Sequence, residues 1–191
     1  MPAGETGQLL ERARGGSDRA LEAFYERAAR KLLPFIRLRL GRSLRGELES
    51  RDILQAVLLK SFTRLPQLQD PGAVMGWLAR MAENEIRDRA DYASRERRDA
   101  ARRVPLEDHA AAVPAPVRQA LSQVILAERV EQLAGALGAL PDAQREIIVL
   151  RKIEEMSFGD IGAKLGKSED ACRMAFARAM AALTVRMQER T

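Results

Sequence analysis

Apolar residues recur every three or four positions along almost the whole chain, which is the spacing of one face of an α-helix. The pattern is clear from Leu21 to Leu32 and from Ile53 to Phe62. No stretch alternates apolar and polar residues for long enough to predict a strand. The chain is therefore predicted to be all-α. Further helices are expected at 72–92, 118–138, 142–153, 158–165 and 169–187.

The segment from about 93 to 117 interrupts this helical pattern. It holds a mixed cluster of charges followed by Pro105, Pro114 and Pro116. Proline-rich segments resist helix and sheet and tend to be extended. We therefore expect two small helical domains, residues 1–93 and 118–191, joined by a flexible linker at 94–117.

Positive charge is concentrated in the first half of the chain. The 191 residues include 32 Lys or Arg and 27 Asp or Glu, so the formal net charge is +5. Residues 1–94 carry 16 basic and 13 acidic side chains, whereas residues 126–191 carry 10 of each. Seven basic side chains lie between Glu26 and Glu47 with no acid among them. Such a run indicates a polyanion or an acidic protein surface as partner, and it also fits a solvated helix face.

Several classes of protein are excluded by residue content. One Cys and one His cannot build a disulfide framework or a Cys/His zinc site. They also leave little basis for catalysis by a Ser-His or Cys-His pair. His109 lies in a stretch rich in Ala and Pro, and Cys172 lies on an apparently packed helical face. No nucleotide-binding glycine loop is present. We expect no enzyme activity, no catalytic residue, no metal and no cofactor.

Neither a membrane span nor a secretory signal is predicted. The longest run without a charged side chain covers residues 132–141, whereas a membrane-spanning helix needs about 20 apolar residues. The N-terminal residues include Glu5 and Glu11 and lack the apolar stretch of a signal peptide. A cytoplasmic protein without membrane insertion is expected.

The clearest local motif starts at Met156 and predicts two helices joined by a short turn. Ser157 can cap the first helix, with Asp160 three residues on as its capping-box partner. Gly166 permits the left-handed turn that ends this helix, and Ser168 can cap the next one. Two helices connected in this way form a helix-turn-helix.

The second helix of this motif has the layout of a DNA-recognition helix. Its N-terminal residues would lie near base edges in the major groove. Lys167, Arg173 and Arg178 can reach phosphates or guanine edges. The same geometry also occurs as plain helix packing, and Glu169 and Asp170 are unfavourable beside phosphate. The zero net charge of residues 126–191 predicts weak DNA binding by this part alone.

Two polar surfaces are predicted in the first half of the chain. Asp52 and Gln55 lie one turn apart on a helix and present a polar patch suited to a partner. Further on, Asn84 and Arg87 follow Trp77 along the next helix. Amide, guanidinium and aromatic groups together suit exposed bases, which proteins bind by stacking and hydrogen bonding. Trp77 also fits an ordinary core position.

In this order, the units resemble the sigma factors of bacterial RNA polymerase, specifically the extracytoplasmic-function (ECF) group. DILQAVLLKSFTRLPQL resembles the segment that grips the clamp helices of the polymerase β′ subunit. GWLARMAENEIRDRAD is similar to the segment that melts the promoter and recognises its minus-10 element. The residues from Leu140 to Leu183 resemble the C-terminal domain, which reads the minus-35 element and meets the β flap.

The resemblance implies roles for individual residues. The contact with core polymerase would use Asp52, Gln55, Leu59 and Phe62. The minus-10 strand would be bound by Trp77, Arg80, Asn84, Arg87 and Asp88, and a flipped base by the turn Gln67 to Gly72. The minus-35 element would be bound by Lys167, Ser168, Arg173 and Arg178. The chain departs from the family at Ala56, where Glu is usual, and at Gly162, where Ala is usual.

The resulting hypothesis is an alternative sigma factor that binds core RNA polymerase, recognises and melts a two-part promoter, and then dissociates. Its implied partners are core RNA polymerase, promoter DNA and, by analogy, an anti-sigma factor. The alternative is a stand-alone helix-turn-helix regulator that binds an operator as a dimer. That alternative predicts tight DNA binding without polymerase.

Overall fold

The computed structural model describes residues 4–44, 48–98, 113–123 and 127–189 of the chain. Every element in these ranges is helical, which confirms the all-α prediction. His109 and most of the predicted linker lie outside the described residues. No described helix combines the length and the apolar character that a membrane crossing requires.

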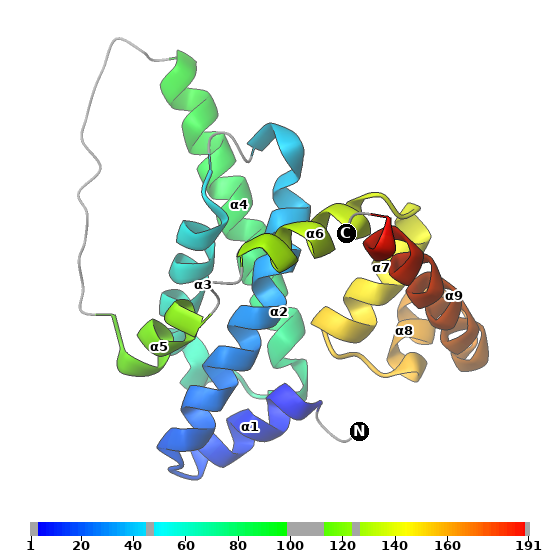
Figure 1. Cartoon of the computed structure of the whole chain (residues 1–191). Helices are drawn as coiled ribbons and strands as arrows, with labels where there is room; N and C mark the ends of the chain where they lie inside the picture. Colours follow the sequence, from blue (N-terminus) through cyan, green and yellow to red (C-terminus); the bar gives the residue numbers. More distant parts are fainter. Residues whose placement is uncertain (1–3, 45–47, 99–112, 124–126, 190–191) are drawn as a thin grey trace.

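The first half of the chain is organised around one long central helix. Helix α2 contacts α1, α3 and α4 and, from the second half, α5 and α6 (Figure 1). Its backbone leaves helical geometry near its end, at Gly41. The bounds are α1 Glu5–Arg14, α2 Asp18–Leu44, α3 Ser50–Arg64, η1 Leu65–Gln67, η2 Pro71–Ala73 and α4 Val74–Arg98.

The second half consists of shorter helices. Helices α7, α8 and α9 lie together on one side of α2, at the right of Figure 1. The predicted bounds of α8 are confirmed, and α9 ends one residue beyond its predicted end. The bounds are α5 Ala115–Gln123, α6 Ala127–Gly138, α7 Asp142–Ile148, the π-helical turn η3 Val149–Ile153, α8 Phe158–Leu165 and α9 Glu169–Gln188.

Two helices extend into the stretch that we expected as a linker. Helix α4 continues to Arg98, because residues 93–98 are mostly good helix formers and the next proline is Pro105. Helix α5 begins at Ala115, and its fully buried Val117 and Ala120 pack into the core around α2. The predicted single helix 118–138 is wrong, since the structure has separate helices α5 and α6.

The protein has two clusters of buried apolar side chains, which meet at η3. The first cluster surrounds α2, and the second lies among α6, α7, α8 and α9. Val149 and Ile153 of η3 belong to the first cluster, whereas Leu150 between them belongs to the second. The Glu154 amide donates to the Val149 carbonyl at 3.0 Å, five residues back, as in a π-helix. The wider turn therefore directs neighbouring side chains into two different cores.

Candidate functional site

The predicted polymerase-binding residues form one stripe along α3. Asp52, Gln55, Leu59 and Phe62 are spaced by three or four residues, so they lie on one helix face. Asp52 and Gln55 are exposed, Leu59 is half-buried and Phe62 is 37% exposed. The opposite face is buried and consists of Ile53, Leu54, Val57, Leu58 and Ser61. The structure therefore leaves a mixed polar and apolar surface open on α3.

A buried carboxylate joins α3 to α4 behind this stripe. Glu85 of α4 accepts from Lys60 at 2.5 Å and from Arg89 at 2.8 Å. Arg89 also donates to the backbone carbonyl of Asp52 at 3.3 Å. Burial raises the pKa of Glu85, but the two cationic hydrogen-bond donors outweigh burial and lower the pKa below 4.5. Glu85 therefore stays ionised and holds the two helices in register.

The predicted minus-10 residues also share one helix face, on α4. Arg80, Asn84, Arg87 and Asp88 are exposed, and Asn84 accepts from Arg87 at 3.4 Å. Trp77 is half-buried and packs against the first core. The structure thus brings the five residues onto one stripe, with the half-buried ring of Trp77 at the N-terminal end of the stripe.

The turn Gln67 to Gly72 is held in shape from both sides. Asp70 caps η2 by accepting from the Gly72 amide at 2.8 Å. Arg14 of α1 donates to the backbone carbonyls of Leu65 and Leu68. These contacts fix the backbone while the side chains of Gln67, Gln69 and Asp70 remain exposed. The turn therefore presents exposed polar side chains on a fixed backbone.

The helix-turn-helix has the caps that the sequence predicts. Ser157 accepts from the Asp160 amide at 3.1 Å and donates to the Asp160 carboxylate at 2.6 Å. Gly166 is left-handed (φ 64°, ψ 36°), and Ser168 accepts from the Ala171 amide at 3.2 Å. These caps fix the angle between α8 and α9.

Gly162 has a packing reason in this turn. A Cβ atom at this position would lie 2.5 Å from the backbone carbonyl oxygen of Lys167. That distance is a clash with backbone, which a side-chain rotation cannot relieve. The departure from the usual Ala therefore allows the turn to approach α8 closely.

An aromatic pair supports the arginine predicted to contact DNA. Phe158 of α8 lies edge-on to Phe176 of α9, with ring centroids 5.5 Å apart. The guanidinium groups of Arg173 and Arg151 lie 5.1 and 4.8 Å from the Phe158 ring centroid. Arg173 also pairs with Glu169 at 2.7 Å. Such stacking is favourable electrostatically and limits the orientations of Arg173.

The remaining predicted minus-35 residues are exposed. Lys167, Ser168, Arg173 and Arg178 all have exposed side chains. Cys172 is fully buried and lies in the second cluster with Ala179 and Leu183, as expected for a packed helical face. Ala171, next to it in the first turn of α9, is exposed.

Arg145 is a structural residue that sequence reasoning missed. It donates to the carbonyls of Leu137, Gly138 and Leu140 at 3.2, 3.3 and 2.9 Å. The first two lie in the last turn of α6, where carbonyls have no amide partner within the helix, and Leu140 lies in the turn that follows. The sequence does show an arginine a few residues after the end of the helix. It does not show that the arginine side chain turns back onto that helix end.

The basic run of α2 is paired within the chain. Each described side chain of this run has an acidic partner. Arg37 pairs with Glu131 of α6 at 3.6 Å, and Arg39 with Glu83 of α4 at 3.0 Å. Of the three interpretations of the run, an acidic protein surface is thus provided by the chain itself.

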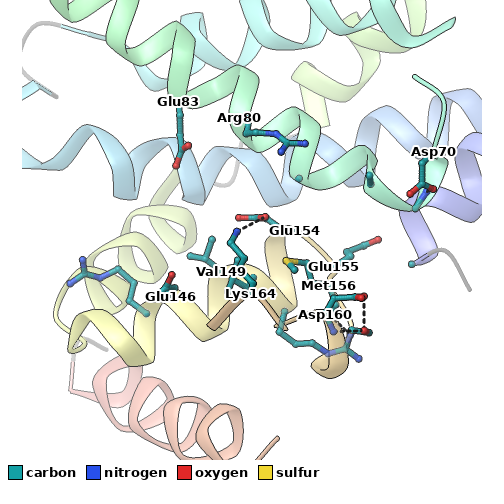
Figure 2. Close-up of a pocket in the computed structure, with 18 of the residues that line it drawn as sticks. Asp70, Arg80, Glu83, Glu146, Val149, Glu154, Glu155, Met156, Asp160 and Lys164 are labelled. Atoms are coloured by element: carbon teal, nitrogen blue, oxygen red, sulfur yellow. Dashed lines mark hydrogen bonds and ion pairs between the residues drawn. The ribbon is translucent and has the colours of Figure 1, made fainter. Parts of the chain in front are cut away.

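A cleft of about 1350 Å³ lies between α4 and the segment from α7 to α8. Figure 2 shows Arg80 and Glu83 on one wall, facing Glu154 and Lys164 on the other. Lys164 pairs with Glu154 at 3.8 Å. Burial raises the pKa of Glu154 above 4.5. The positive charge of Lys164 lowers this pKa and the negative charge of Glu83 raises it, and the net result is a rise. The cleft thus places one of the predicted minus-10 residues opposite an acidic wall.

The chain is similar to known proteins of transcription. The family model "Sigma-70, region 4" matches residues 130–183. The RNA polymerase sigma factor CarQ of Myxococcus xanthus is 34% identical over 166 residues, which cover 86% of this chain and 87% of CarQ. The ECF RNA polymerase sigma factor SigD of Mycobacterium tuberculosis is 29% identical over 173 residues, which cover 90% of this chain and 79% of SigD.

A solved structure of CnrH in complex with the cytosolic domain of CnrY aligns over 97% of this chain and 98% of that chain. The sequence identity is 25% and the TM-score is 0.43.

The fold and its exposed recognition helix define a helix-turn-helix protein of transcription. Within that class, the chain belongs to the ECF sigma factors of RNA polymerase. It therefore binds RNA polymerase and directs promoter recognition, and it has no catalytic role of its own. Family membership decides in favour of the sigma factor over the stand-alone dimeric regulator.

Proposed function

We propose that three exposed stripes divide the work of promoter recognition. The α3 stripe binds the clamp helices of the β′ subunit, the α4 stripe binds the melted minus-10 strand, and the start of α9 binds the minus-35 element. Residues 1–93 and 118–191 are the two functional units, and residues 94–117 connect them. The observation that carries this proposal is that the α3 and α4 sets each lie along one largely exposed helix face, and that the residues of the third set are exposed at and near the start of α9.

The α3 stripe suits a protein partner. Phe62 offers an exposed ring, and Gln55 and Asp52 offer hydrogen-bonding groups about two and three turns away. Interfaces that bind proteins commonly combine an aromatic anchor with a polar rim. Ala56 removes one carboxylate that the family usually supplies, so Asp52 carries the negative charge of this contact.

The α4 stripe suits single-stranded DNA. Arg80 and Arg87 supply positive charge, Asn84 supplies an amide for base edges, and Trp77 supplies a ring at the core end. The turn Gln67 to Gly72 lies at the start of the same helix and is a suitable place for a flipped base. Extrusion of a base costs a few kcal/mol, so a fixed turn that receives the base would favour melting.

The start of α9 suits the major groove of duplex DNA. Ser168 caps the helix, so its hydroxyl is already bonded to the Ala171 amide and the helix N-terminus is available to a phosphate. Arg173 is held by the Phe158 ring, while Arg178 is exposed one turn further on. A well-placed arginine-to-guanine contact discriminates by about 1–3 kcal/mol. We also propose that the C-terminal unit meets the β flap.

By analogy with the family, we also propose an anti-sigma factor as a partner and the cytoplasm as the place of action. We infer that the chain dissociates from polymerase after initiation. The weak DNA binding predicted for residues 126–191 alone is consistent with this cycle, because tethering on polymerase raises the effective concentration of a weakly binding unit at its DNA.

The experiment is promoter-specific transcription with purified bacterial core polymerase on fragmented genomic DNA from the source organism. Asp52→Ala should reduce core binding in size-exclusion chromatography, with Glu11→Ala on α1 as the matched acidic control. Arg173→Ala should reduce initiation and leave core binding unchanged, with Arg186→Ala as its control. Loss of core binding in Arg173→Ala would show that the two surfaces are misassigned.

A further inference from the structure

Met174 of α9 is the most exposed large apolar side chain among the described residues. It is 59% exposed, and it is not one of the four residues that we expect at the minus-35 element. At 3.6 residues per turn, it lies opposite the side of α9 that packs in the second cluster through Cys172, Ala179 and Leu183. Packing in the core therefore does not explain an apolar side chain at this position. Helix α9 lies at the right edge of Figure 1.

Short side chains surround Met174 on this side of the helix. Ala171 lies one turn before it and Ala177 one turn after it, and both are exposed. Asp170, four residues before Met174, has a side chain that is 95% exposed. We name these four residues the outer face of α9. Because alanine ends at Cβ, the Met174 side chain projects beyond its two apolar neighbours.

The chemistry of the outer face fits base edges and not phosphates. Asp170 repels a phosphate, and neither Met174 nor Ala177 carries a cation that could neutralise one. In the major groove, thymine presents a C5-methyl group to apolar side chains, and cytosine presents an amino group to carboxylates. The outer face therefore matches groups that the bases offer and the DNA backbone does not.

The place of Met174 along α9 also suits the major groove. A recognition helix inserts its N-terminal residues. Met174 follows the first residue of α9, Glu169, by five residues or about 8 Å. Val185 is on the same side of α9 and is 53% exposed, but it lies about 16 Å further along the helix. Because the major groove is about 12 Å wide, an inserted α9 places Met174 at the bases and Val185 outside the groove.

Arg173 and Met174 point in different directions from the helix. The Arg173 guanidinium is turned towards α8, where it lies 5.1 Å from the Phe158 ring centroid. It also pairs with Glu169 at 2.7 Å. Consecutive helical residues are about 100° apart around the axis, so Arg173 lies to one side of the outer face. Hydrogen bonding by Arg173 therefore leaves the base pair in front of Met174 to be read by apolar contact.

We propose that Met174 is a specificity-determining residue, which reads one thymine of the minus-35 element through the C5-methyl group of that base. Arg173 contacts a neighbouring base pair by hydrogen bonding. This inference rests on the proposed function, because it names the base chemistry that the start of α9 recognises. It requires that the preference for this thymine depend on its methyl group and not on its hydrogen bonds.

The preferred element is first measured by selection. The full chain, assembled with purified bacterial core polymerase, binds a library of DNA duplexes of random sequence, and the bound duplexes are sequenced. Wild type should enrich an element that contains a thymine on one strand. Met174→Ala should lose the preference at that thymine and keep the other enriched positions, whereas Arg173→Ala should lose an enriched guanine. Met174→Ala should fold as wild type does, because the side chain is exposed and alanine favours helix.

Uracil then tests the methyl contact itself, because it pairs as thymine does and lacks the C5-methyl group. Replacing only that thymine by uracil in the selected duplex should weaken wild-type binding about 4-fold, the effect of one buried methyl group. Met174→Ala should bind the two duplexes equally. Met174→Leu keeps an apolar side chain and should retain most of the difference. Val185→Ala is the matched control and should behave as wild type, since Val185 is equally apolar and exposed but lies outside the groove.

The outcomes separate this inference from the proposed function. Equal sensitivity to uracil in wild type and Met174→Ala would overturn the inference, and so would an element in which Met174→Ala changes no thymine. The same loss in Val185→Ala would also overturn it. If Arg173→Ala still altered the element in these cases, the proposed function would stand alone. If wild type enriched no sequence, or Arg173→Ala selected the wild-type element, the proposed role of α9 would fail and this inference with it.

Discussion

Replacing Arg145 with alanine tests how much of the C-terminal unit depends on one side chain. The guanidinium caps the end of α6 through the carbonyls of Leu137, Gly138 and Leu140. The Leu137 carbonyl keeps a hydrogen bond from the Leu140 amide at 3.2 Å, so the main loss is the donor to the partly buried Leu140 carbonyl. A buried carbonyl left unpaired costs about 1–3 kcal/mol, and partial access to water favours the lower end, about 1 kcal/mol. A lost cation at a helix C-terminus adds about 0.3–1 kcal/mol. The expected destabilisation is therefore about 1–2 kcal/mol.

Hydrogen exchange by mass spectrometry measures this loss locally. A change of about 1–2 kcal/mol should speed exchange of the slowest amides in α6 to α9 by about 5- to 30-fold. Arg145→Lys keeps the charge but not the planar fork of donors, so its effect should be intermediate. The matched control is Arg186→Ala on α9, because Arg186 and its partner Glu189 are half-exposed. If Arg145→Ala changed exchange no more than this control, the capping argument would be wrong.

Three further predictions concern stability and binding. Gly162→Ala should destabilise the helix-turn-helix by about 1–3 kcal/mol in urea unfolding, because its methyl group meets the Lys167 carbonyl. Glu85 has a folded pKa below its unfolded value, so its contribution to stability is present above about pH 4.5 and is lost as pH falls through the folded pKa; Glu85→Gln should flatten urea-unfolding stability between pH 6 and pH 3. Ser168→Asp should preserve stability, since Asp also caps helices, but reduce promoter-specific transcription through repulsion of phosphate, whereas Ser168→Ala should lose about 1 kcal/mol of stability.

Local features of the fold could be predicted from the sequence. Ser157, Gly166 and Ser168 each act through atoms within a few residues, so their spacing was enough to place the ends of α8 and α9. The face of α3 with Asp52 and Gln55 was predicted in the same way, since helical periodicity separates an exposed stripe from a buried one. Interactions between residues that are close in the sequence can therefore be predicted from residue type and spacing.

Features that depend on distant partners were not predicted. The contact of Glu155 with Thr6 spans 149 residues, and nothing near Glu155 in the sequence indicates that it is buried. The basic run of α2 was predicted to bind a polyanion or an acidic protein surface. Charge counting cannot show that Glu131 and Glu155 of the same chain are acidic partners of this run. At Gly162 the sequence showed only a departure from the usual Ala. Its close neighbour is the backbone carbonyl of Lys167, and the identity of a residue does not reveal where its backbone lies.

The π-helical turn η3 has a consequence for genetics. Its residues contribute to both apolar cores, with Val149 and Ile153 in one and Leu150 in the other. A substitution of one of these three buried residues therefore disturbs the packing where the two units meet. Screens for variants that lose one activity and keep the other should recover changes on the surfaces of α3, α4 and α9, and none at Val149, Leu150 or Ile153.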